Sequence, residues 1–285
     1  MMDNLQVGLA LMNSFSRQKW LHHDIIFVVT DQKERQWAGD EAFTRSQIVP
    51  TGKIREAIMI DFDSFLFDTV GILTEGFNGE MPNLDLVNTA IRLAKYQGLD
   101  KVSLFKYDHH RTTSNVVKST ADKKQEKQEK SQLPYPIHLY RELLTFVSSL
   151  LTKQQLKQLQ QWTSMIRGRR GDRWFDKSIT LMYNVYNQLT GLSTGAHAWY
   201  RKQSTHAITL TDSYHDQESP PLSDSSSNSH KRSHNMLGVG HTVEGIVRSM
   251  NNLIEELHQS FFLYFMDSTD TYYGFEHYMP NMALL

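Results

Sequence analysis

The side chains best suited to bind a ligand or a partner are gathered in one stretch, EGFNGEMPNLDLVN, at residues 75–88. Amides and carboxylates lie there beside turn-forming residues, so a sharp backbone could hold a polar group through side-chain and main-chain hydrogen bonds. The candidate residues are Asn78, Gly79, Glu80, Pro82, Asn83 and Asp85. The alternative is an ordinary connection between a strand and a helix, in which these residues serve only the turn.

Local chemistry predicts the shape of this stretch. Asn78 and Gly79 tolerate a positive φ, so the chain can reverse its direction there. Pro82 favours an extended backbone in the residue before it. Asn83 fits the N-cap of a helix, and Asp85 would face the positive end of that helix. We therefore predict a sharp turn followed directly by a helix.

A second candidate surface lies on the last helix that the sequence predicts. Apolar residues recur at helical spacing from Val243 to Phe261, which indicates one continuous apolar stripe. The opposite, polar side carries three further binding candidates, Asn251, Asn252 and His258. A helix face that is simply solvated is the alternative interpretation.

Composition excludes several classes of function. The chain has 285 residues and a formal net charge of −1, whereas dedicated nucleic-acid binders carry a clear basic excess. It contains no cysteine, so thiol chemistry and disulfides are excluded. No signal peptide and no apolar window of about 18 residues occur, and on this ground alone the chain would be expected to be soluble.

Strands and helices alternate along the predicted core. IIFVV at Ile25 to Val29 is fully apolar and mostly β-branched, as expected of a strand buried on both faces. The helix after Asn83 should end at Gly98. The other predicted helices cover residues 5–15, 137–162 and 174–189, and the other predicted strands cover residues 57–60, 67–74, 101–105 and 206–212. This order predicts an α/β fold, a three-layer α/β/α sandwich around a mostly parallel mixed sheet.

Two segments lack the apolar area that would offset the entropy of ordering them. Residues 118–132 are rich in charge and glutamine, and residues 213–235 are rich in serine, histidine and proline. We expect both to be disordered insertions on the surface.

Three segments together resemble the GPI attachment protein family, whose members are subunits of the glycosylphosphatidylinositol (GPI) transamidase. They are EGFNGEMPNLDLVN, YRKQSTHAITL and EGIVRSMNNLIEELHQSFFLYFM, in that order. The resemblance implies a zinc-aminopeptidase-like luminal domain at the endoplasmic reticulum membrane, in a complex that exchanges a C-terminal signal for a GPI lipid. Its implied partners are the other transamidase subunits, including a cysteine-protease-like catalytic subunit, together with the GPI lipid and the precursor protein.

Family members carry membrane spans on both sides of this domain, and neither is present in this chain. The resemblance therefore implies a fragment or an incomplete gene product, with the first strands of the domain missing. It divides the chain into an aminopeptidase-like domain at residues 1–266 and a remnant at 267–285 that leads to a missing span. The acidic stretch DSTDTYYGFEH departs from the apolar family pattern.

Active di-zinc aminopeptidases of this fold offer a pattern for a metal site. That pattern places Asp3 at the bridging carboxylate, Glu34 and Asp61 at ligand carboxylates, and His241 at the late histidine ligand. Lys33 then falls where the general-base glutamate belongs, and an ammonium group cannot accept a proton from metal-bound water at neutral pH. The resemblance thus implies no cofactor, with a residual zinc site as the alternative. Each of the four ligand candidates also has an ordinary explanation, as a helix-start, loop, strand-end or turn residue.

Three hypotheses follow. The first is a non-catalytic scaffold that holds the precursor protein or the GPI lipid near a separate catalytic subunit. The second is a zinc-dependent enzyme that forms or cleaves an amide. The third, which sets the resemblance aside, is a generic soluble α/β binding domain.

Overall fold

A four-stranded mixed sheet forms the centre of the protein. The computed structural model describes residues 2–30, 37–46, 54–99, 101–104, 171–191, 193–213, 225–253, 263–274 and 277. The strands are β1 (Glu56–Asp61), β2 (Thr69–Leu73), β3 (Val102–Ser103) and β4 (His206–Ser213), in the spatial order β1-β4-β2-β3. β1 pairs with β4 and β2 pairs with β3 in parallel, whereas β2 and β4 are antiparallel.

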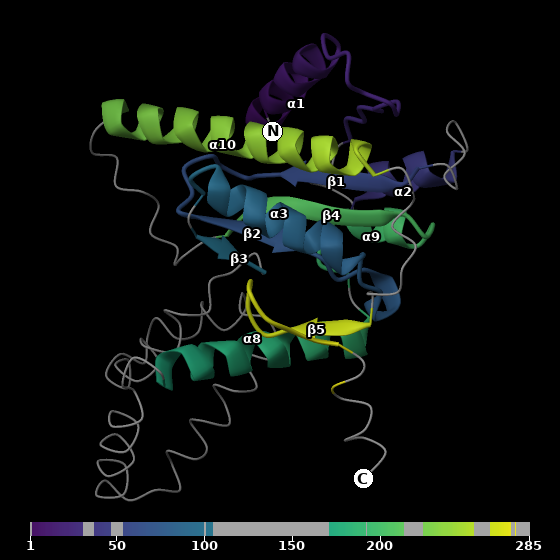
Figure 1. Ribbon diagram of the computed structural model, residues 1–285, viewed down its shortest axis with the longest axis vertical. Helices are drawn as coiled ribbons and strands as arrows, with labels where there is room; N and C mark the ends of the chain where they lie inside the picture. Colours follow the sequence, from purple (N-terminus) through teal and green to yellow (C-terminus); the bar gives the residue numbers. More distant parts are fainter. Residues whose placement is uncertain are drawn as a thin grey trace, which may run out of the picture.

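Helices cover both faces of this sheet (Figure 1). One face packs against α1 (Met2–Phe15), α3 (Leu84–Tyr96) and α10 (Ser225–Asn251), and the other against α2 (Ala38–Arg45) and α9 (His197–Arg201). The alternation of side chains along β1 explains the two layers, because Ile58 and Ile60 join the first cluster whereas Ala57 and Met59 join the second. The predicted α/β fold with a mixed sheet is confirmed.

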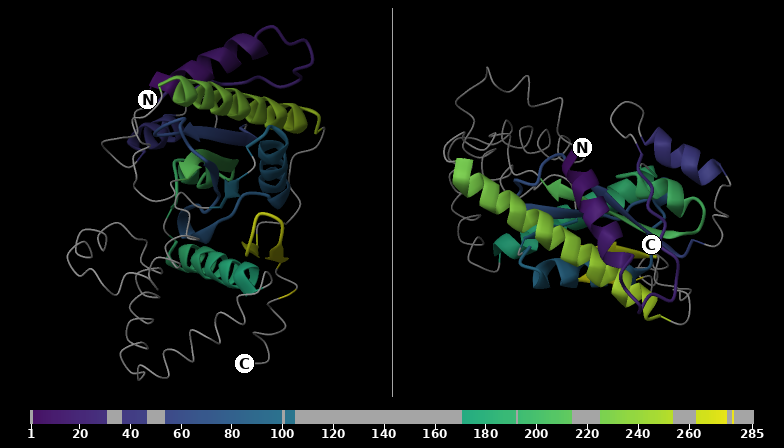
Figure 2. Two further views of the ribbon diagram at one scale, coloured as in Figure 1. Left: turned by 90° about the vertical axis from the view of Figure 1, so that its left-hand side faces the viewer. Right: turned by 90° about the horizontal axis from the view of Figure 1, so that it is seen from above.

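The far end of the molecule is built from a helix and a hairpin. α8 (Gly171–Thr190) packs against β5 (Tyr264–Met266), which pairs with β6 (Tyr272–Gly274). Figures 1 and 2 show α8 and the hairpin at the end of the molecule opposite α1 and α10, with the sheet between them. The predicted domain boundary at residue 266 falls inside the hairpin.

The turn and helix predicted around residues 78–98 are confirmed. Asn83 is the N-cap of α3, and its side chain accepts a hydrogen bond of 2.8 Å from the backbone N–H of Asp85. Gly98 follows the helix with φ of 80°. The apolar side of α3 is buried in the core through Leu84, Val87, Ile91 and their neighbours. α3 thereby fixes the position of the loop that precedes it.

The strand predicted at Ile25 to Val29 is wrong. These residues form no strand, and Ile26, Phe27 and Val28 are exposed, as is Val29 with 78% of its surface accessible. A short apolar run cannot reveal whether a partner strand exists beside it. Here the run follows α1, and the Phe27 ring lies against Phe15 of that helix at 6.4 Å between centroids.

The predicted disordered insertion at residues 213–235 is also wrong in part. Ser213 is the buried last residue of β4, and α10 begins at Ser225. Within that helix, the Asn235 side chain is buried and donates hydrogen bonds to the carbonyls of Phe65 and Phe67. The first insertion at 118–132 and the helix predicted at 137–162 lie outside the described residues.

The remaining predicted elements are confirmed with shifted ends, as α1, β1, β2, β3, β4 and α8. Across the described ranges, no helix is both long and apolar enough to cross a lipid bilayer.

Candidate functional site

The loop between β2 and α3 reverses as predicted. Residues Phe77–Gly79 form a single 3-10 turn, in which Asn78 has φ of 58° and Gly79 has φ of 74°. The backbone N–H of Gly76 donates to the carbonyl of Glu80 at 2.9 Å and closes the turn. Left-handed backbone at two successive residues is what asparagine and glycine tolerate best, which explains this local sequence.

The loop residues divide into a buried part and an exposed part. Pro82 and Asn83 are buried, whereas Asn78, Glu80 and Asp85 are exposed. Pro82 also serves the interior, because its carbonyl accepts a hydrogen bond of 3.0 Å from the Tyr264 hydroxyl. The exposed side chains are therefore the ones available for recognition.

Aromatic and basic side chains flank the exposed turn. Phe77 packs edge to face on Trp199, with 4.9 Å between ring centroids. The Lys202 ammonium lies 5.4 Å from the Trp199 ring centroid. We call Phe77, Asn78, Glu80, Trp199 and Lys202 together the loop surface.

A buried carboxylate supports the loop from below. Glu75 is fully buried; one carboxylate oxygen accepts a hydrogen bond of 2.8 Å from Asn184 Nδ2, and the other accepts one of 3.1 Å from Thr194 Oγ1. Burial raises the pKa of this carboxyl, against the opposing effect of these hydrogen bonds. Glu75 thus joins the end of β2 to α8 and to the segment before α9.

A buried histidine completes the support. His197 Nε2 lies 3.1 Å from the main-chain carbonyl of Glu75, and its Nδ1 lies 2.9 Å from Thr209 Oγ1. A carbonyl can only accept, so Nε2 carries a proton. Burial lowers the pKa of His197 to about 4, so the ring is neutral near pH 7 and its Nδ1 then accepts from the hydroxyl.

This histidine should make stability depend on acid. Because its folded-state pKa lies below the ordinary 6.5, its contribution is present above pH 6.5 and is lost as the pH falls towards 4. We expect the wild-type free energy of unfolding to fall by about 3 kcal/mol over that window relative to His197→Gln, which has no titrating ring. Urea denaturation of both chains at a series of pH values measures the difference. Parallel curves would contradict the buried neutral state.

Arg201 and His206 connect the loop to β4. Arg201 Nη1 donates to the carbonyl of Thr205 at 3.2 Å and to His206 Nδ1 at 3.3 Å. The same Nδ1 accepts from the backbone N–H of Asn83 at 3.2 Å. Glu80 supplies the nearby carboxylate, with its Oε2 3.9 Å from Arg201 Nη2. Chemically, this arrangement fixes a loop and presents its exposed side chains, since Glu75 and His197 use their polar atoms on interior partners.

Of the residues predicted for a metal site, the three that the structure describes, Asp3, Asp61 and His241, do not form one ligand cluster. Asp3 lies in the first turn of α1 and pairs with Arg232 of α10. Asp61 ends β1, and His241 lies on α10 with its Nδ1 3.7 Å from Glu244. Glu34 and Lys33 lie outside the described residues. Over the described ranges no three histidine, aspartate or glutamate side chains cluster as metal ligands, so those residues do not fit a di-zinc site.

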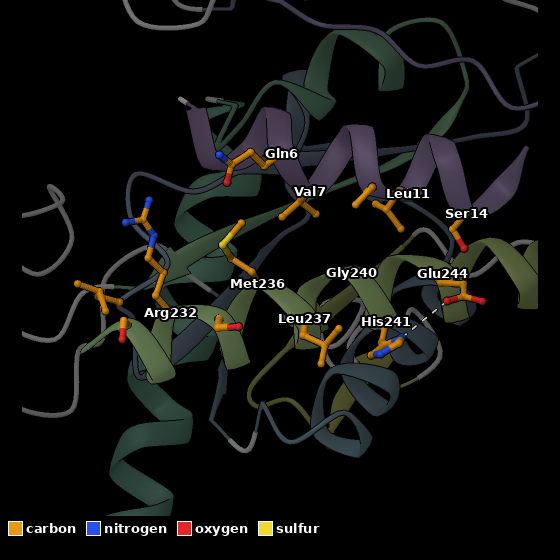
Figure 3. Close-up of a pocket in the computed structure, with 14 residues that line it drawn as sticks. Gln6, Val7, Leu11, Ser14, Arg232, Met236, Leu237, Gly240, His241 and Glu244 are labelled. Carbon is orange, nitrogen blue, oxygen red and sulfur yellow. Dashed lines mark ion pairs between the residues drawn. The ribbon is translucent and has the colours of Figure 1, made fainter. Parts of the chain in front are cut away.

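His241 instead lines a groove between α1 and α10 (Figure 3). The groove has a volume of about 710 Å³, and apolar side chains such as Val7, Leu11 and Met236 form its floor. Arg232 lies at one end, and the His241–Glu244 pair lies at the other.

The three binding candidates predicted on the last helix differ in where they lie. Asn251 is buried rather than placed on a polar face, since its Oδ1 accepts from the backbone N–H of His22 at 2.8 Å and its Nδ2 donates to the Trp20 carbonyl. Asn252 is exposed just beyond the end of α10. His258 lies outside the described residues.

Sequence reasoning missed the interior residues that hold the loop. Glu75 is the first residue of the stretch EGFNGEMPNLDLVN and directly follows a predicted strand, but its burial carries no local signal. The local sequence also gave no sign that three further residues would support the loop: Asn184, Thr194 and His197. Arg201 and His206 stand in YRKQSTHAITL, one of the segments that carry the family resemblance.

Comparison with known proteins agrees with that resemblance. A sequence profile described as Gaa1-like, GPI transamidase component, matches residues 2–130 and 142–285. The GPI transamidase component GAA1 of Saccharomyces cerevisiae is 26% identical over 289 residues, which cover 98% of this chain and 34% of the relative. The GPI transamidase component gaa1 of Schizosaccharomyces pombe is 24% identical over 241 residues, which cover 85% of this chain and 29% of the relative.

This chain thus spans about a third of the length of these curated relatives. The profile match, by contrast, extends over most of the chain, including the loop surface and the residues that support it. On this basis the protein belongs to the Gaa1-like family of GPI transamidase components.

Proposed function

We propose that this chain is a non-catalytic scaffold subunit of the GPI transamidase complex. It would help to present the precursor protein, the GPI lipid, or both, during attachment of the anchor. Its partners would be other transamidase subunits, including a cysteine-protease-like catalytic subunit. The family membership supports the place in the complex, since the relatives are named as components of that transamidase.

The loop surface is the observation that carries the scaffold role. Two of its exposed residues, Asn78 and Glu80, project from a turn whose backbone is fixed by the buried Glu75 and by Asn83. A loop held rigidly from below loses little conformational entropy when a partner binds to its exposed side chains. Such pre-organisation favours a docking surface.

The finer parts of the proposal follow from the resemblance. The fold would be an aminopeptidase-like scaffold, and the domain would lie on the luminal side of the endoplasmic reticulum membrane. The mixed sheet with helices on both faces is compatible with such a scaffold. Asp3, Asp61 and His241 do not lie in a common ligand cluster, and this favours a scaffold over a zinc enzyme.

Asn78→Gly tests the proposal at the tip of the loop. Glycine accepts the positive φ at this position, so the substitution removes only the exposed carboxamide. We expect the thermal midpoint to change by no more than about 2 °C, since exposed substitutions rarely exceed about 0.5 kcal/mol. Recovery of the other subunits with the tagged chain should fall several-fold, and GPI attachment to a reporter precursor should fall with it.

Ser204→Gly is the matched control, because Ser204 is exposed, has φ of 61° and lies outside the loop surface. It should leave assembly and transfer at the wild-type level. Full assembly and full transfer in Asn78→Gly would refute a docking role for the loop tip.

A further inference from the structure

Arg201 is a charged residue buried directly beneath the loop surface. Only 8% of its side chain is exposed, and burial lowers the pKa of its guanidinium. A buried cation is costly unless hydrogen bonds and an opposite charge compensate it. The partners of Arg201 therefore decide what this side chain can do.

One edge of the guanidinium is fully used. Nη1 donates to the Thr205 carbonyl and to His206 Nδ1, at 3.2 Å and 3.3 Å. Nε and Nη2 lie on the other edge, where their N–H bonds run parallel and match the two oxygens of a carboxylate.

That second edge is incompletely occupied. Nε is buried and has no hydrogen-bond partner among the residues that the structure describes. The carboxylate paired with this edge belongs to Glu80, whose Oε2 lies 3.9 Å from Nη2, too far for a hydrogen bond. Glu80 is itself half-exposed, so solvent competes strongly for its carboxylate.

The loop backbone holds the guanidinium in this position. A side chain at Gly76 would place its Cβ 3.1 Å from Arg201 Cβ and 3.3 Å from Arg201 Cγ. The aliphatic part of Arg201 thus passes directly along the start of the turn that carries Glu80. The Nε–Nη2 edge of Arg201 therefore lies next to the loop surface.

We propose that the Nε–Nη2 edge of Arg201 binds a carboxylate of an acidic peptide segment, and that Glu80 is the intramolecular occupant which this ligand displaces. The group that already lies near this edge is the carboxylate of Glu80. A carboxylate from a ligand has the same planar pair of oxygens and can take its place. The inference rests on the proposed function in one respect, the origin of the peptide. On that function, the peptide belongs to a precursor protein or to another subunit that docks on the loop surface.

Titration of the full chain with the dipeptide acetyl-Asp-Glu-amide tests the site. The Arg201 Nε–H resonance reports binding by nuclear magnetic resonance, at constant ionic strength, with acetyl-Asn-Gln-amide as the neutral probe. Glu80→Gln should bind the acidic probe about three- to five-fold more tightly than wild type, because an exposed pair is worth up to about 1 kcal/mol. Glu80 is half-exposed, so this variant should keep its fold.

Arg201→Lys keeps the charge but removes the fork, and it should abolish saturable binding. Lys19→Ala removes an exposed cation outside the loop surface and is the control, with a change of less than about two-fold. Equal affinity in Glu80→Gln and wild type would overturn the proposal. So would tighter binding of inorganic phosphate than of the acidic dipeptide, which would indicate a phosphate site.

These measurements use the isolated chain, so their failure would leave the scaffold role standing. Conversely, normal assembly in Asn78→Gly would not affect whether Arg201 binds a carboxylate. The two results are therefore distinguishable.

Discussion

Glu75→Ala is expected to lower the free energy of unfolding by about 4 kcal/mol. The substitution leaves Asn184 Nδ2 without its acceptor, and an unsatisfied buried donor costs about 1–3 kcal/mol. Thr194 Oγ1 loses one acceptor but keeps the main-chain carbonyl of residue 75 at 3.2 Å. It also leaves a cavity in a fully buried position. The damage should spread, because Asn184 Oδ1 accepts from the Met266 N–H of β5. Urea denaturation measures the loss.

Glu75→Gln is the matched control for volume. It keeps one carbonyl acceptor, so we expect a loss of about 1 kcal/mol near neutral pH. Burial raises the folded-state pKa of Glu75, so the contribution of the carboxyl is present in full below pH 4.5 and is lost as the pH rises through the folded pKa. The stability gap between wild type and Glu75→Gln should therefore narrow with rising pH. A loss below about 1 kcal/mol in Glu75→Ala would show that the network does not hold the loop.

The parts of the fold that could be predicted depend on local chemistry. The reversal at Asn78 and Gly79 follows from which residues accept a positive φ, and the start of α3 follows from the side-chain oxygen of Asn83. Both are decided within a few residues of the chain. The short apolar run at residues 57–60 predicted β1 from a few adjacent residues as well.

The predictions that were wrong concern segments whose structure depends on partners distant in the sequence. The apolar run at Ile25 to Val29 has the composition of a strand, but a strand exists only where another strand pairs with it. The serine-rich stretch that begins α10 has the composition of a disordered segment. Contacts that composition cannot show hold this stretch in a helix. The buried Asn235 side chain donates to the carbonyls of Phe65 and Phe67, and Lys231 forms an ion pair with Asp68.

The same reason explains which site residues were found. Asn78 and Glu80 stood out because turn chemistry and charge are visible in a short stretch. Glu75 meets partners more than a hundred residues away, at separations of 109 and 119 positions for Asn184 and Thr194. Asn251 was assigned to a polar face by helical spacing, and its burial by the loop at Trp20 is another contact of long range.

Gly79→Ala is expected to destabilise the chain by about 2–5 kcal/mol through backbone strain and a steric overlap. With φ of 74°, an alanine here adopts a left-handed backbone at a cost of about 1–2 kcal/mol. Its Cβ would also overlap the carbonyl oxygen of Gln188, a backbone atom of α8 that cannot rotate away. Forced displacement of packed backbone adds about 1–3 kcal/mol. Thermal and urea denaturation should both register the loss.

Gly240→Ala is the matched control, since a Cβ at that position of α10 meets nothing within 4 Å. It should be neutral or stabilising by up to about 1 kcal/mol, because alanine favours a helix over glycine. Gly79→Asn separates the two causes in the loop: asparagine tolerates the left-handed backbone but still carries a Cβ. If the contact with α8 dominates, Gly79→Asn should lose nearly as much stability as Gly79→Ala.

The contact at Gly79 also links stability to the proposed docking role. α8 can approach the loop only because Gly79 has no side chain, and the N–H of Asn78 donates to the Gly191 carbonyl just beyond that helix. Gly79→Ala should therefore displace the loop from α8 and reduce complex assembly even at temperatures where the chain stays folded. Asn78→Gly removes a side chain while this contact stays intact. Loss of assembly in both variants would assign docking to the loop, whereas loss in Gly79→Ala alone would assign it to the position of α8.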